Sequence, residues 1–137
     1  MQVQAMIRSH PDEQGEADAV LIRCIELCYE CAQTCISCAD ACLAEETVRE
    51  LTQCIRLNLD CADVCTATGV VGSRRTGSNE LVLASLLETC MEACRLCGDE
   101  CDRHAQQHDH CAICAETCQR CEIACRNAVE TVRPTLQ

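Results

Sequence analysis

The stretch from Cys24 to Cys42 reads CIELCYECAQTCISCADAC, and it decides how the rest of the chain is interpreted. Its six cysteines stand at positions 24, 28, 31, 35, 38 and 42, so the successive gaps are 4, 3, 4, 3 and 4. Residues three and four apart are neighbours on one face of an α-helix, with Cβ atoms about 5–6 Å apart. The stretch therefore predicts a helix whose inward-facing stripe carries sulfur where other bundles carry leucine.

Three later segments continue this spacing, and every gap between successive cysteines inside a predicted helix is 3, 4 or 7. We expect helices at about residues 15–44, 47–68, 79–105 and 109–132. Short, long and short connections between them predict an all-α, up-down-up-down four-helix bundle with a cysteine-lined core. Residues 1–14 are expected to form an N-terminal extension with a short helical turn, and residues 15–133 the bundle.

Local signals place the ends of these helices. Thr47 and Glu50 form a T-x-x-E capping box at the start of the second helix. Residues 69–78, GVVGSRRTGS, hold three glycines and two arginines and are expected to be the long loop. Ser78 or Asn79 can cap the third helix and Asp109 the fourth, which Pro134 ends.

Eighteen thiols would converge on one axis in this bundle, and they are the candidate metal ligands. A core packed by cysteine as a small hydrophobe, or joined by disulfides, is the alternative. Packing alone does not require cysteine at nearly every inward position, and cysteines at i and i+4 of one helix suit disulfide geometry poorly. The candidates are Cys24, Cys28, Cys31, Cys35, Cys38, Cys42, Cys54, Cys61, Cys65, Cys90, Cys94, Cys97, Cys101, Cys111, Cys114, Cys118, Cys121 and Cys125.

The composition narrows the class of protein. A formal net charge of −11 argues against nucleic acid or an anionic membrane surface as partner. The first twenty residues show no secretory signal, and no run of about 18 apolar residues could span a bilayer. We therefore expect a cytoplasmic protein with reduced thiols. No catalytic motif is visible, which indicates that the protein is not an enzyme.

The pattern of thiols favours Cu(I). Zinc takes four tetrahedral ligands per ion, and iron–sulfur clusters are typically held by C-x₂-C-x₂-C runs in loops. Cu(I) selects thiolates, and a continuous lane in which thiolates bridge between ions fits it best. We expect ions of the same order in number as the cysteines. The alternatives are a general zinc or cadmium sink and a thiol redox or iron–sulfur electron carrier.

The repeated C-x₃-C and C-x₂-C steps over about residues 17–132 resemble the cytosolic branch of the bacterial copper storage proteins. That resemblance implies a four-helix bundle storing many Cu(I) ions for the cytosol, assembled as a homotetramer. Copper ions are the expected cargo, and copper chaperones or low-molecular-weight thiols are the expected carriers.

The topology brings the connections near residues 45 and 107 to one end of the bundle, together with three histidines. His104 continues the seam and is expected to bind or hand over the outermost ions, with His108 and His110 beside it. We expect copper to be loaded there. Leu21, Leu83, Leu87, Ala128 and Val132 would close the other end. Asn58 takes a seam position between two cysteines, either to fix the register or to interact with metal-bound thiolates.

Overall fold

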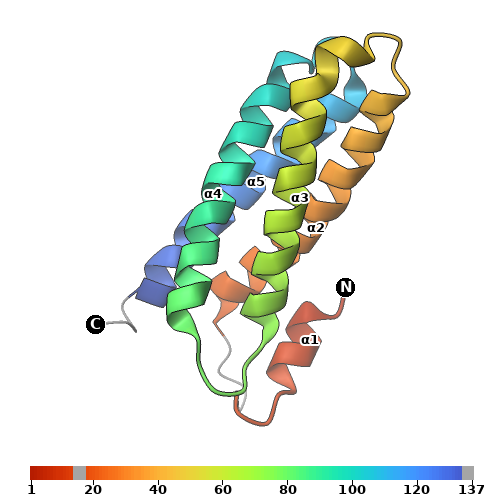
Figure 1. The fold of residues 1–137 in the computed structure, drawn as a ribbon. Coiled ribbons are helices and arrows are strands. Elements are labelled where there is room, and N and C mark those ends of the chain that lie inside the picture. Colours follow the sequence, from red (N-terminus) through yellow and green to blue (C-terminus); the bar gives the residue numbers. More distant parts are fainter. Residues whose placement is uncertain (14–17, 134–137) are drawn as a thin grey trace.

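The computed structural model describes residues 1–13 and 18–133, in which all regular elements are helices. Four long helices form the body of the molecule, preceded by a short helix and interrupted by one 3₁₀ turn (Figure 1). These elements are α1 (Val3–Arg8), α2 (Ala19–Leu43), η1 (Val48–Leu51), α3 (Thr52–Ser73), α4 (Glu80–Arg103) and α5 (Asp109–Val132).

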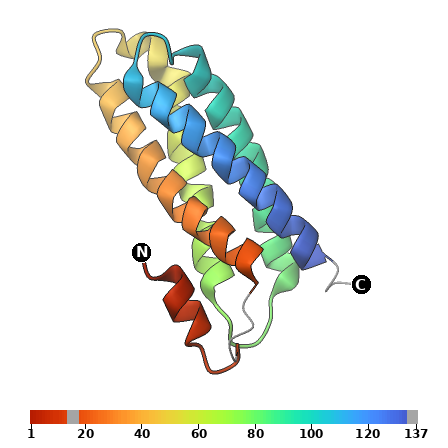
Figure 2. The same ribbon diagram turned by 180° about the vertical axis from the view of Figure 1, so that it is seen from behind.

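Helices α2 to α5 pack as an up-down-up-down bundle, as the sequence predicts. Each long helix lies against two others: α2 against α3 and α5, and α4 against α3 and α5. The α2–α3 and α4–α5 connections therefore lie at the same end, the upper one in Figures 1 and 2. The division into an extension at 1–14 and a bundle at 15–133 remains a prediction. None of the helices in the described part of the chain is long and apolar enough to span a bilayer.

The expected loop at residues 69–78 is wrong in its first half, because α3 continues to Ser73. Two glycines inside α3 let neighbouring side chains approach its backbone. A Cβ on Gly69 would stand 3.1 Å from Cζ of Tyr29, and one on Gly72 would stand 3.1 Å from Cγ1 of Ile25. These glycines serve close packing of α2 against α3, and the turn follows at Gly77, whose φ is +69°.

Two of the predicted caps are also wrong. Thr47 makes no side-chain cap; the chain enters η1 first, and α3 follows at Thr52. Asp109 is the first residue of α5 rather than its cap. At the start of α2 the Asp18 side chain accepts a hydrogen bond from the Val20 amide at 2.9 Å. The predicted start of this helix at about residue 15 and the predicted stop of the fourth helix at Pro134 lie outside the described residues.

Sulfur fills the middle of the core and hydrocarbon closes one end. Around the lower ends of the helices lie the predicted apolar residues, none more than 7% exposed: Leu21, Leu83, Leu87, Ala128 and Val132. Helix α1 packs against α2 near this end, with Ile7 buried. The segment after α1 contacts the α3–α4 loop, where Arg75 pairs with Glu13 and His10 hydrogen-bonds to Thr76. One of the two arginines of this loop, Arg75, is thus held in an ion pair.

Candidate metal centre

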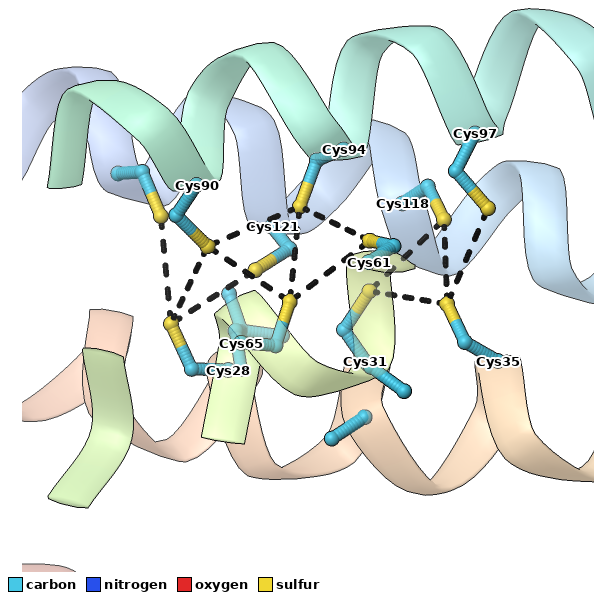
Figure 3. Close-up of a cluster of buried hydrophobic side chains, with 14 of the residues drawn as sticks. Cys28, Cys31, Cys35, Cys61, Cys65, Cys90, Cys94, Cys97, Cys118 and Cys121 are labelled. Atoms are coloured by element: carbon cyan, nitrogen blue, oxygen red, sulfur yellow. Dashed lines mark hydrogen bonds between the residues drawn. The ribbon is translucent and has the colours of Figure 1, made fainter. Parts of the chain in front are cut away.

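All eighteen cysteines lie inside the bundle as free thiols, and none is more than 1% exposed. Their sulfur atoms approach one another across helices, as the central part of the lane in Figure 3 shows. The Sγ–Sγ distance is 3.6 Å between Cys65 and Cys90, and 3.8 Å between Cys31 and Cys118. Burial and register therefore place every sulfur predicted from the sequence in one continuous lane.

The thiols form overlapping groups with the dimensions of metal sites. Sulfurs that share an ion through bonds of about 2.3 Å, the value for zinc, lie roughly 3.8–4.0 Å apart in tetrahedral or trigonal geometry. In each of at least five groups, all four sulfurs lie within 4.8 Å of one another. These groups are Cys28/Cys90/Cys121/Cys125, Cys31/Cys65/Cys94/Cys121, Cys31/Cys35/Cys61/Cys118, Cys35/Cys97/Cys114/Cys118 and Cys38/Cys42/Cys54/Cys111.

Four cysteines belong to two of these groups each: Cys31, Cys35, Cys118 and Cys121. A thiolate has several lone pairs and can bind two ions at once, so shared cysteines can link neighbouring sites into a chain. The arrangement consequently suits a multinuclear metal–thiolate core better than a set of isolated sites.

Neighbouring thiols also share protons. The hydrogen bond to Cys101 lowers the pKa of Cys54 to about 3. The hydrogen bonds of Cys101 to Cys114, Cys38 and Cys54 raise the pKa of Cys101. Burial, followed by the nearby charge of Cys54, raises the pKa of Cys42 to about 11. Hydrogen bonds between neighbouring thiols thus move their pKa values apart, and a buried lane cannot carry many uncompensated negative charges. Each arriving cation would displace a proton from such a cluster.

Asn58 lies fully buried in the lane, where its amide faces sulfur on both sides. Its Oδ1 accepts from Cys114 at 2.9 Å and from Cys97 at 3.3 Å. Its Nδ2 donates to the Cys54 carbonyl at 2.8 Å and to the Cys54 sulfur at 3.4 Å. The amide therefore connects the outermost thiol group to the rest of the lane, and its role toward metal remains a prediction.

The three histidines of the upper end take different positions. Nδ1 of His110 lies 3.4 Å from Sγ of Cys38, 3.6 Å from Cys111 and 4.0 Å from Cys42, so His110 stands over the outermost thiols. His108 stacks on it at 5.4 Å and pairs with Glu45. His104, the histidine that the seam favoured, directs Nε2 to Glu100 at 2.9 Å.

Glu100 is a mostly buried acid on α4 that the cysteine spacing did not predict. It is only 8% exposed, and it pairs with both Arg103 and His104. The signal was present in the sequence as a glutamate followed by arginine at i+3 and histidine at i+4, a spacing that brings side chains together on a helix.

A helical bundle whose core is a lane of free, linked thiols is, as a class, a protein that binds many soft metal ions. Comparison with known proteins identifies the family: residues 17–130 match the copper storage protein family, and the chain belongs to it. This is a family of storage proteins rather than of enzymes.

Solved structures of relatives agree with this assignment. The copper storage protein Ccsp from Streptomyces lividans, loaded with 10 copper equivalents, is 50% identical, with a TM-score of 0.89 over 93% of this chain and 98% of that chain. Another structure of the Streptomyces lividans protein is described as a cytosolic copper storage protein. The Cu(I)-bound copper storage protein BsCsp3 is 36% identical, with a TM-score of 0.69 over 77% of this chain and 93% of that chain.

A relative from Bacillus subtilis (strain 168) matches by sequence. It is the cysteine-rich protein YhjQ, 38% identical over 104 residues, which are 76% of this chain and 91% of the relative. The predicted all-α bundle, the copper storage function and multiple copper ions as cargo are thus confirmed.

Proposed function

We propose that this chain stores many Cu(I) ions along its axis, with the eighteen cysteines as ligands and the histidine end as the point of loading. The observation that carries the proposal is the overlap of the four-thiol groups, in which shared sulfurs link four groups in series. Such sharing lets the number of bound ions approach the number of thiols, whereas separate tetrahedral sites would hold about four.

The charge of the core supports a monovalent soft ion. One Cu(I) replaces one thiol proton, so a lane filled at about one ion per sulfur stays close to neutral. Zn²⁺ in a four-thiolate site leaves two excess negative charges, which is costly where no buried cation compensates them. In the described part of the chain, no buried residue is a lysine or an arginine. The lane therefore favours Cu(I) over zinc or cadmium.

Loading from the upper end is supported by the position of His110. The outermost group, Cys38/Cys42/Cys54/Cys111, has this imidazole on its outer side, whereas hydrocarbon closes the opposite end of the lane. A neutral imidazole nitrogen is itself a ligand for copper. In this proposal His110 receives the ion first, and His104 and His108 hold the surrounding turn through Glu100 and Glu45.

The protein works in the cytoplasm in this proposal, has no enzymatic activity, and assembles as a homotetramer of independent bundles. The cytosolic description of the Streptomyces lividans relative supports the location. Copper chaperones or low-molecular-weight thiols would carry the ions to and from it. Neither nucleic acid nor membrane is a partner, in keeping with the net charge of −11.

An anaerobic titration of the fully reduced protein with Cu(I), against a competing chelator, tests the proposal. We expect tight uptake of about one ion per cysteine. Saturation at about four or five ions, or ready displacement of copper by zinc, would favour separate tetrahedral sites and contradict the proposal. Visible charge-transfer absorption with labile sulfide would instead indicate an iron–sulfur carrier.

A further inference from the structure

A small cleft opens on the side of the bundle between α2 and α5 and reaches the outermost thiol group. It has a volume of about 210 Å³ and is lined by Gln33, Thr34, Ser37, Cys38, His110 and Ile113. One water molecule occupies roughly 30 Å³ in the liquid, so a small organic molecule fits and a folded protein does not. Four larger clefts formed by the described residues have no cysteine in their lining.

The floor of this side cleft is part of the lane. Cys38 is 1% exposed and belongs to the outermost group, and its sulfur lies 3.4 Å from Nδ1 of His110. The larger cleft at the tip of the bundle is lined by His104 and His108 but by no thiol. A molecule that seeks a metal-bound sulfur therefore meets one through the side cleft, not at the tip.

His110 lines this side cleft next to Cys38, and only its Nδ1 contacts the thiols. Its Nε2 is buried and has no hydrogen-bond partner among the described residues. Histidines that ligate metal permanently almost always donate their second nitrogen to a carboxylate or carbonyl, which fixes the ring. The ring of His110 lacks that anchor, so it can turn aside without breaking a hydrogen bond at Nε2.

The lining indicates the kind of molecule that fits. The walls carry an amide and two hydroxyl groups, with Gln33 donating to Ser37 at 2.9 Å, and none of the six lining residues is an acid, a lysine or an arginine. Such walls suit a small polar molecule. Because Cu(I) exchanges readily only with another soft ligand, the molecule should carry a thiol.

We propose that this side cleft binds a low-molecular-weight thiol, which removes Cu(I) from Cys38 by ligand exchange while His110 moves aside. The sulfur of the incoming thiol bonds to the ion, the bond from the ion to Cys38 breaks, and the thiol proton passes to Cys38. Copper remains Cu(I), so no oxidant or reductant is consumed. This proposal rests on the proposed function, since it needs a loaded store.

The test measures how fast L-cysteine moves copper from the loaded protein to a bulky chromogenic Cu(I) chelator, under anaerobic conditions. The rate without L-cysteine is subtracted, and each rate is divided by the copper bound to that variant. Ser37→Phe places a ring in the side cleft and should slow the thiol-dependent transfer about tenfold. The matched control, Ser85→Phe, changes an exposed serine on α4 outside the described clefts and should keep the wild-type rate.

A second variant tests the proposal if the Ser37→Phe protein does not take up copper. Ile113→Ala trims an exposed wall of the side cleft and should make thiol-dependent transfer faster than in the wild type. The proposal is overturned if L-cysteine does not accelerate transfer from the wild type. It is also overturned if Ser37→Phe transfers copper as fast as Ser85→Phe, or if Ile113→Ala brings no increase. A protein that never takes up many copper ions would instead contradict the proposed function.

Discussion

Replacing His110 and His104 by leucine should change the stability of the reduced, metal-free protein in opposite directions. Nε2 of His110 is buried and has no hydrogen-bond partner in residues 1–13 and 18–133, and such a group costs about 1–3 kcal/mol. His110→Leu removes that cost but also loses the stacking on His108, worth about 0.5–1.5 kcal/mol. It also loses the weak contacts of Nδ1 with Cys38 and Cys111, whose sulfurs still hydrogen-bond to each other at 4.0 Å. A net gain of about 1 kcal/mol remains, which raises Tm by roughly 4 °C in a chain of this size.

His104→Leu should act the other way. Its Nε2 lies 2.9 Å from Glu100, whose side chain is 10% exposed against 21% for His104. Removing the imidazole leaves one oxygen of a mostly buried carboxylate unpaired, although Arg103 still binds the other. Because the site is close to water, we expect a loss of about 1 kcal/mol rather than the larger cost of a fully buried pair.

Thermal unfolding of the two variants at the same pH, in a reducing buffer and with chelator present, measures both effects. A copper titration of the same variants measures the rate of Cu(I) uptake and the number of ions bound. His110→Leu should take up Cu(I) more slowly and bind fewer outermost ions, while His104→Leu should bind as many ions as the wild type. If His110→Leu lowers Tm, the assignment of His110 as a destabilising residue kept for copper is refuted; if His104→Leu raises Tm, the stabilising role of its pair with Glu100 is refuted.

Three further outcomes follow from the core. Asn58→Leu should keep the metal-free fold within about 1 kcal/mol of the wild type, because it mainly loses weak thiol donors, yet it should lower the Cu(I) capacity in titrations. Leu87→Ala, at 0% exposure in the closed end, should cost about 2–5 kcal/mol in chemical denaturation with no change in capacity. Finally, the pKa of Cys42 is raised from 9.0 to about 11, so its contribution to stability is complete below pH 9 and is lost as the pH rises toward 11. The fall in Tm of metal-free protein over that range should be shallower in Cys42→Ala, and an equal slope would contradict the shift.

The helices and their buried faces were predictable because a single periodic signal runs through them. Cysteine recurs mostly every three or four residues, and an α-helix completes one turn every 3.6 residues. The inward position of each thiol therefore follows from the spacing alone. The structure buries every one of these cysteines. The closed end followed in the same way, from apolar residues that keep the register beyond the last sulfur, such as Leu87 and Ala128.

The histidine end was harder to predict because helical periodicity stops there. Helix α4 ends at Arg103, and His104 has left helical geometry, with φ −108° and ψ 1°. Its side chain therefore cannot be placed by extending the seam. His110 lies in the first turn of α5, next to the seam residue Cys111, and reaches the thiols only because of the path of the intervening turn.

Tertiary packing also overrode local signals in α3. Gly69 and Gly72 indicated a loop, but their lack of side chains is used for contact with Tyr29 and Ile25, and the helix continues. The T-x-x-E signal at Thr47 failed because a 3₁₀ turn precedes α3. Spacing between helices is not encoded in a single segment, so neither outcome was visible in the local sequence.

The contacts of Gly69 and Gly72 have a consequence for how the helices find their alignment. A row of identical side chains does not define a single register between two helices. If one helix shifted by seven residues along its neighbour, many thiols would again face thiols. The cysteines alone therefore do not distinguish one register from the next. Tyr29 against Gly69 and Ile25 against Gly72 break this uniformity, because Gly69 and Gly72 are the two glycines of α3 and lie four and seven residues beyond Cys65. Alignment of α2 with α3 is thereby set beyond the last cysteine of α3, beside the first cysteines of α2, and the remaining thiol positions can stay uniform.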